Sequence, residues 1–223
     1  MSLGDASWLH VERRAAAIVL VLPLGSTEQH GPHLPLSTDT DIAVALAWRL
    51  AAARPDVLVA PAMAYGSSGE HDGFAGTVSI GQAALETVLV EIGRSTDAFR
   101  ALVLVSTHGG NAEPVRRAVD LLAHEGRRVM AWSPSQYRDA HAGRSETSIL
   151  LALDPRRVRM DLAEAGATQP LDELMATMRT GGVKAVSANG VLGDPIGATD
   201  EEGAALLDAM AADLFARVGA FVD

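Results

Sequence analysis

Short apolar runs alternate along the chain with longer stretches in which apolar residues recur at helical spacing. A continuous run rich in Val, Ile and Leu, such as Ala15–Leu22, is typical of a buried strand. A stretch with Ile42, Leu46 and Leu50 at four-residue spacing is typical of a helix with one apolar face. On this basis strands are predicted at 15–22, 57–60, 101–106 and 128–132, and helices at 8–14, 40–53, 81–99, 115–125, 145–153 and 201–218.

Strands that alternate with helices in this way indicate an α/β fold, in which helices cover both faces of a mostly parallel sheet. Because no repeat, linker or long charge run divides the chain, residues 1–223 are predicted to form a single domain. A glycine-rich stretch, Ala62–Ile80, interrupts the alternation. Irregular segments of this length are often functional, with an ordinary loop tip as the alternative. We expect this one to face the substrate through Tyr65, Glu70 and His71.

The segment Leu22–Asp39 begins where the first predicted strand ends, and it reads LPLGSTEQHGPHLPLSTD. Ligands of open α/β sheets bind at this carboxyl edge. Glu28 and His30 are two residues apart, so they point to the same side if the strand conformation continues. Imidazole combined with carboxylate suits zinc, manganese or ferrous iron better than calcium or magnesium. The segment therefore predicts a metal site, with Glu28, His30, His33 and Asp39 as candidate ligands.

Each of these four residues also has an ordinary interpretation. Glu28 and His30 could be solvated loop residues, and His33 could belong to a turn. Asp39 could be the N-cap of the helix that follows it, with Ser37 or Thr38 as alternative caps. The cluster nevertheless favours a functional site, because charged groups beside a buried strand are rare unless they are paired or bound to metal.

A second strand edge repeats this arrangement, since the predicted strand Ala101–Ser106 runs directly into Thr107 and then His108-Gly109-Gly110-Asn111. His108 can converge on the first segment as a further metal ligand. The N–H groups of Gly109 and Gly110 precede a predicted helix and could stabilise an anion or a developing oxyanion. Asn111 is predicted to contact the substrate. A structural histidine followed by glycines is the alternative for this motif taken alone.

The third block is His141-Ala-Gly-Arg-Ser-Glu146-Thr-Ser148. Glu146 begins an otherwise apolar predicted helix, where an ordinary N-terminal glutamate would gain only tenths of a kcal/mol from the helix dipole. His141 could be a loop histidine without a special role. Near a metal it becomes a candidate general acid, because imidazole titrates near neutral pH.

The composition limits the class of function. A net charge of −10 and a pI near 5.1 argue against a nucleic-acid partner, because phosphate-binding surfaces need clustered Lys and Arg. The absence of cysteine excludes disulfides, thiolate zinc sites and cysteine nucleophiles, and it fits a cytoplasmic protein. Neither a signal peptide nor an apolar run of about eighteen residues is present, so no membrane association is expected.

Taken together, the three blocks resemble the creatininase family of metal-dependent amidohydrolases. The matching patterns are G-S-T-E-Q-H-G-P-H-L-P at Gly25–Pro35 with Asp39 after it, H-G-G-N at His108–Asn111, and H-A-G-x-x-E-T-S at His141–Ser148. The resemblance spans roughly residues 15–215. It implies a three-layer α/β/α fold, a centre of two divalent metal ions (Zn, Fe(II) or Mn), and a homohexamer or another homo-oligomer.

By motif position, the resemblance implies that Glu28 and His108 hold one metal, that His30 holds the other, and that Asp39 bridges both. One position departs from the pattern, because Gly110 stands where creatininases carry a further glutamate ligand. Glu146 or water would then complete the second metal. Tyr137 stands where creatininases carry a tryptophan that covers the substrate, so we expect Tyr137 to contact the substrate and creatinine itself to be an unlikely one.

Three further stretches, Gly25–Ala43, Tyr65–Gly81 and Gly193–Gly203, are similar to those creatininase-family members that act as peptidases in mycofactocin maturation. Such peptidases release a short C-terminal piece from a modified precursor peptide. A small-molecule amidohydrolase would share the metal chemistry, and a non-catalytic metal-binding partner protein is the alternative from another class. A nucleotide-binding domain is disfavoured, since no G-x-G-x-x-G or P-loop lysine pattern opens a helix.

The expected chemistry is metal-assisted hydrolysis of an amide bond. A divalent ion lowers the pKa of bound water toward neutrality. Asp39 or Glu146 would accept the proton as the water attacks, and His141 would protonate the leaving amine. The metal and the N–H groups of Gly109–Asn111 would stabilise the oxyanion.

Overall fold

A computed structural model describes residues 2–223 and contains a four-stranded parallel sheet in the order β2-β1-β3-β4. Its strands are β1 (Val19–Leu24), β2 (Val57–Val59), β3 (Ala101–Ser106) and β4 (Val129–Trp132). Val19 pairs with both Val57 and Ala101, so the two central strands start level with each other. The predicted parallel α/β architecture is confirmed.

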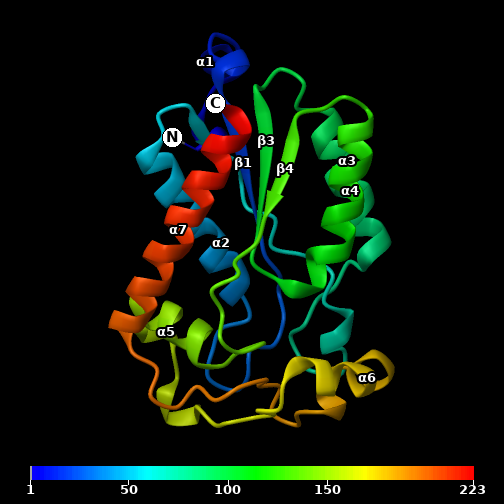
Figure 1. Cartoon of the computed structure of the whole chain (residues 1–223), viewed down its shortest axis with the longest axis vertical. Coiled ribbons are helices and arrows are strands. Elements are labelled where there is room, and N and C mark those ends of the chain that lie inside the picture. The colour runs from blue at the N-terminus through cyan, green and yellow to red at the C-terminus, as the bar shows by residue number, and fades with distance from the viewer. Residues whose placement is uncertain (1) are drawn as a thin grey trace.

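Helices cover both faces of the sheet, which gives three layers. In Figure 1, α2, α5 and α7 lie on one side of the strands, and α3 and α4 lie on the other. A further helix, α6, lies beyond the carboxyl ends of the strands, far from the chain termini. The helices are α1 (Trp8–Glu12), α2 (Thr38–Ala53), α3 (Gln82–Arg94), α4 (Ala112–His124), α5 (Arg144–Leu153), α6 (Leu171–Gly181) and α7 (Asp200–Val222).

The two faces of the sheet bury different side chains. Along β1, Val19 and Val21 belong to the core shared with α2, α5 and α7, whereas Leu20 and Leu22 belong to the core shared with α3 and α4. All six residues of β1 and all six of β3 are buried. Neither face of these strands contacts water, so polar residues do not alternate with apolar ones, and the runs are continuously apolar.

Several predicted boundaries were wrong, each for a local reason. β1 starts at Val19 because no partner strand lies opposite Ala15–Ala17, which forms a 3-10 turn instead. The strand continues through Pro23, whose carbonyl still accepts a hydrogen bond from Met63 N–H at 2.9 Å. α3 ends at Arg94 rather than Phe99, because the hydroxyls of Ser95 and Thr96 bond to its last carbonyl groups.

Helix α6 was missed entirely. It buries none of its residues in the core, although Leu171, Met175 and Met178 recur at helical spacing. Among residues 2–223, no helix is long and apolar enough to cross a membrane.

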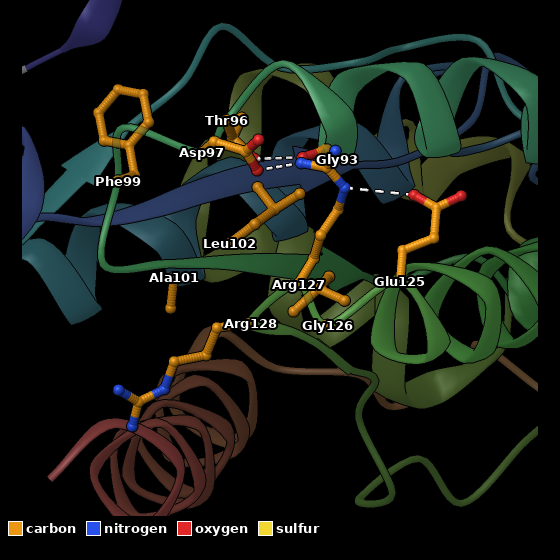
Figure 2. Close-up of a pocket in the computed structure, with 11 residues that line it drawn as sticks. Gly93, Thr96, Asp97, Phe99, Ala101, Leu102, Glu125, Gly126, Arg127 and Arg128 are labelled. Atoms are coloured by element: carbon orange, nitrogen blue, oxygen red, sulfur yellow. Dashed lines mark hydrogen bonds and ion pairs between the residues drawn. The ribbon is translucent and has the colours of Figure 1, made fainter.

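A cavity of about 390 Å³ lies at the amino-terminal edge of the sheet, near the ends of α3 and α4. Figure 2 shows Arg127 between Asp97 and Glu125, with a bond to each. Arg128 donates to the Phe221 carbonyl of α7 at 2.8 Å. Arg127 and Arg128 are therefore already bonded to residues at the ends of neighbouring helices, and this cavity does not resemble a ligand site.

Close packing of α5 against α7 yields a stability prediction. A Cβ atom at Gly203 would lie 1.8 Å from the Ser148 carbonyl oxygen, so the two helices approach backbone to backbone there. We expect Gly203→Ala to lower the free energy of unfolding by about 1–3 kcal/mol through overpacking, measured by urea denaturation.

Gly219→Ala, in the same helix, is the matched control. A Cβ atom there meets nothing closer than 3.5 Å, so helix propensity should stabilise this variant by up to about 1 kcal/mol. Equal effects of the two substitutions would contradict the packing argument.

Candidate metal centre

The candidate ligands meet at the carboxyl edge of the sheet, where the two central strands end. Glu28 and His30 lie in the loop after β1, His108 follows β3, and Asp39 lies in the first turn of α2. Glu146 lies in the first turn of α5. All five are buried, and the side chains of Glu28 and His30 are 0% exposed. Carboxylates and imidazoles at this depth require partners that water cannot provide.

One group of ligand atoms comes from Glu28, Asp39 and His108, and these atoms lie within 4.8 Å of one another. His108 Nδ1 lies 3.1 Å from Glu28 Oε1 and 3.4 Å from Asp39 Oδ2. The other Asp39 oxygen, Oδ1, lies 3.5 Å from His30 Nε2. The Asp39 carboxylate therefore presents one oxygen to each side, which is the arrangement of a bridging ligand.

A second group contains His30, His141 and Glu146, and a third contains Glu28, His71 and His141. His30 Nε2 lies 3.9 Å from Glu146 Oε2, and His141 Nδ1 lies 3.8 Å from Glu28 Oε1. Glu146 therefore lies on the His30 side of Asp39, where the sequence pattern lacks a ligand at Gly110.

Unpaired polar atoms test whether a cation fits here. Among the described residues, both oxygens of Glu28 and Nε2 of His30 are buried without a hydrogen-bond partner. Ligand atoms about 2.1 Å from one ion lie about 3.0–3.4 Å apart, close to the separations of 3.1 Å between His108 and Glu28 and 3.4 Å between His108 and Asp39. The donor set of imidazoles and carboxylates suits Zn, Mn or Fe(II), so the residues fit a divalent metal.

Hydrogen bonds to backbone carbonyls determine which nitrogen of each imidazole is free. His108 Nε2–H donates to the Ser67 carbonyl at 2.8 Å, which leaves the Nδ1 lone pair facing Glu28 and Asp39. His30 Nδ1–H donates to the Glu28 carbonyl at 3.2 Å, which leaves Nε2 facing Asp39 and Glu146. A carbonyl on the far nitrogen is the usual way in which a protein fixes the tautomer and orientation of a metal ligand.

Gln29 is a residue of the site that the sequence analysis missed. Its Oε1 accepts from Gly31 N–H at 2.8 Å and its Nε2 donates to the Gly190 carbonyl at 3.0 Å, so the orientation of the amide is fixed. Nε2 also donates to His71 Nδ1 at 2.8 Å, which places the His71 N–H on Nε2, 3.3 Å from Glu28 Oε1. His71 Nε2 therefore faces Glu28 without a hydrogen bond to it. The position of Gln29 between Glu28 and His30 was the feature of the sequence that could have identified it as a residue of the site.

His141 differs from the general acid that the sequence predicted. Its Nε2–H donates to the Gln29 carbonyl at 2.8 Å, so the nitrogen that faces the cluster is Nδ1 with its lone pair. Burial, with His30 and His71 nearby, holds the pKa of His141 well below its ordinary value. A neutral ring with a lone pair toward the cluster favours ligation over proton donation.

Raised pKa values at His30, His108 and Glu146 follow from burying acids beside bases. Burial opposes the charged form of His108, but Glu28 and Asp39 raise its pKa to about 10. His30 behaves in the same way, and Asp39 with Glu146 raises its pKa to about 9. Burial raises the pKa of Glu146 to about 7, against the attraction of His30. In the absence of metal, protons on His30 and His108 therefore replace the missing positive charge.

Two other predicted residues contact the cluster from outside. Glu70 Oε1 lies 3.5 Å from His108 Nε2, on the side of the ring away from Glu28. A Cβ atom at Gly110 would lie 2.1 Å from Glu70 Oε1, so Glu70 fills the space into which a side chain at Gly110 would grow. This explains physically why a glycine stands where the family pattern has glutamate.

Three predicted residues lie elsewhere. His33 Nε2 pairs with Thr147 Oγ1 at 2.9 Å, and His33 belongs to none of the candidate ligand groups among residues 2–223. Asn111 is fully buried, and its amide joins Gly25 and Ser67 instead of facing a cavity. Tyr65 is 51% exposed and does not line either cavity beside the cluster.

Two cavities reach the cluster. The larger, of about 480 Å³, is lined by His71, His108 and His141 together with Gly109, Gly110 and residues of α6. The smaller, of about 160 Å³, is lined by Asp39, Glu146 and Tyr137. The Tyr137 hydroxyl is buried without a hydrogen-bond partner in the described chain, so it is available to a bound molecule.

Comparison with known proteins agrees with this geometry. The family model described as "Creatininase: Creatinine amidohydrolase" matches residues 4–218. The chain is 54% identical over 193 residues to a mycofactocin precursor peptide peptidase of Mycolicibacterium smegmatis, covering 83% of this chain and 78% of the relative. It is 31% identical over 193 residues to a creatinine amidohydrolase of Pseudomonas putida, covering 71% and 74% of the two chains.

Solved creatininase structures share the fold over nearly the whole length. A manganese form superposes with a TM-score of 0.86 at 27% identity, covering 100% of this chain and 99% of the other. A glutamate-to-glutamine variant of Zn–Zn type gives 0.86 at 26% identity, covering 100% and 99%. The chain belongs to the creatininase family of hydrolases, which act on C–N bonds.

Proposed function

We propose that this protein is a divalent-metal-dependent peptidase that removes a short C-terminal piece from the modified precursor peptide of mycofactocin. The observation that carries the proposal is the buried group of Glu28, Asp39 and His108, whose unpaired ligand atoms surround a common point. The substrate class follows the relative of Mycolicibacterium smegmatis, which is 54% identical and is named a mycofactocin precursor peptide peptidase.

We propose two ions, Zn, Mn or Fe(II), held on either side of Asp39. Glu28 and His108 would hold one, and His30 with Glu146 and His141 would hold the other. Bound divalent ions lower the pKa of water and polarise the amide carbonyl. A homohexamer or other homo-oligomer, and a cytoplasmic location, remain predictions.

Glu146 is the residue best suited to move the proton. Its carboxylate lines the smaller cavity beside the cluster, where it can accept a proton from water and pass it on. Ala142 N–H donates to Glu146 Oε2 at 2.6 Å and fixes the carboxylate at the start of α5. Gly109 and Gly110 line the larger cavity, where their peptide groups can face the developing oxyanion. Glu146 takes the proton-donor role first expected of His141.

The substrate assignment is tested by mass spectrometry of the precursor peptide incubated with purified protein, in parallel with creatinine and a formamide. We expect cleavage of the peptide, loss of cleavage on chelation, and recovery when Zn or Mn is added back, because the hydrolytic water depends on the metal. Hydrolysis of the small amides alone would instead support a small-molecule amidohydrolase, and chelator-insensitive cleavage would contradict metal dependence.

Glu28→Gln is the matched variant for this assay, since it removes a buried charge without changing the shape. It should lower bound metal and reduce turnover by about 10³-fold or more, while circular dichroism stays unchanged. Glu91→Gln, on the exposed surface of α3, should match wild type. Wild-type turnover by Glu28→Gln with metal bound would overturn the ligand assignment.

Loading the metal should release protons. His30 and His108, with pKa values of about 9 and 10, are charged at pH 7.5 in the metal-free protein, whereas metal ligands must be neutral. We expect about two protons to be released as zinc fills the centre, measured from the dependence of the calorimetric enthalpy on the ionisation enthalpy of the buffer.

The pH dependence of this proton release follows from the raised pKa values of His30 and His108. Proton release should stay near two from pH 7 to about 8, fall as the pH rises through 9 and 10, and vanish above about 11, where both rings are already neutral. His124→Gln, which changes an exposed histidine outside the centre, should leave the proton count unchanged. A buffer-independent enthalpy at pH 7.5 would contradict the protonated state of His30 and His108.

A further inference from the structure

Helix α6 forms one wall of the larger cavity beside the metal centre. Leu171, Met175 and Met178 recur at helical spacing and line this cavity, although α6 buries none of its residues in the core. The elements that α6 contacts most are two short turns, Gly69–His71 and Val183–Ala185. Its apolar side chains are therefore available to a ligand in the cavity instead of being used to hold the domain together.

Arg179 lines the same cavity and has no counter-ion. Within residues 2–223, no carboxylate lies within ion-pair distance of its guanidinium. The acidic residues of the wall are already engaged, because Glu113 pairs with Arg116 and Arg117, and Glu70 lies 3.5 Å from His108 Nε2. Arg179 is exposed, and its position in the lining of this cavity distinguishes it from other unpaired arginines, because an anionic group of a ligand bound there can reach it.

We propose that Arg179 binds the free C-terminal carboxylate of the peptide substrate, while Leu171, Met175 and Met178 contact the apolar part of the piece that is released. This rests on the proposed peptidase function and specifies its substrate. A guanidinium matches a carboxylate through two parallel hydrogen bonds, which fix orientation as well as charge. Methionine side chains adapt to apolar groups of different shape.

The position of Arg179 also limits the length of the released piece. The histidines of the centre and Arg179 line one cavity of about 480 Å³, a volume that suits a small ligand of a few residues and not a long chain. A peptide anchored at its carboxylate by α6 would present one particular amide bond to the metals. Small cyclic amides have no carboxylate and would gain nothing from Arg179.

The test compares two forms of a synthetic C-terminal segment of the mycofactocin precursor peptide, one with a free carboxylate and one with a C-terminal amide. For wild type we expect kcat/KM to fall about 10–100-fold on amidation, mainly through KM. Arg179→Gln should lose about the same factor with the free acid and no longer discriminate between the two forms. Arg179→Lys should retain part of the preference.

Arg13→Gln is the matched control, since Arg13 is exposed and lies outside the cavities that reach the centre. Bound metal should be the same in all four proteins, because Arg179 is not a ligand. Equal kcat/KM for acid and amide in wild type, or unchanged discrimination in Arg179→Gln, would overturn the role of Arg179 and leave the peptidase function standing.

If metal-loaded wild type cleaves neither form, the proposed function fails and binding decides the role of Arg179 separately. Calorimetry with the uncleaved peptides should then give a Kd about tenfold lower or more for the acid than for the amide in wild type, and no difference in Arg179→Gln. Equal Kd values for the two forms in wild type would exclude a carboxylate site on α6.

Discussion

The burial of Glu28 and Asp39 beside four imidazoles is the constraint on which the rest of this structure depends. Neither oxygen of Glu28 has a hydrogen-bond partner among the described residues, and its side chain is fully removed from solvent. An isolated carboxylate in such a place would cost several kcal/mol. Compensation comes from a cation, either a proton on His30 and His108 or a metal between them. The pKa values of the two histidines and the metal affinity of the site are thus consequences of the same burial.

The topology of the sheet explains why these residues meet. β1 and β3 are adjacent central strands that run in parallel and end level with each other, Leu24 opposite Ser106. The loops that follow them therefore emerge side by side. The first turns of α2 and α5, which cover the same face of the sheet, then bring Asp39 and Glu146 to the same place. Backbone carbonyls of Glu28 and Ser67, with Ser26 Oγ donating to Asp39 Oδ2 at 2.5 Å, orient the ligands.

Most of the fold, and the clustering of the candidate metal ligands, could be predicted from the sequence, because both depend on local patterns. Apolar runs identified the four strands, and Glu28, His30, Asp39 and His108 follow strand ends or begin a helix, where topology alone brings them together. The features that could not be predicted from the sequence depend on contacts between distant segments. Whether Asn111 faces a cavity or joins Gly25 to Ser67, or which nitrogen of His141 meets Gln29, is decided by residues far apart in the chain. Helix α6 shows its apolar residues at helical spacing in the sequence but buries none of them in the core, so its side chains remain available to a ligand.

Metal binding at this cluster is tested most directly by anomalous diffraction from crystals of the zinc-loaded protein, with data collected on both sides of the zinc absorption edge. We expect a peak enclosed by Glu28, Asp39 and His108, and a second peak on the other side of Asp39, near His30 and Glu146. A first peak alone would leave one ion at the centre and correct the count. The absence of any peak among these residues, with zinc bound only at the surface, would contradict the claim that their burial exists to hold a metal.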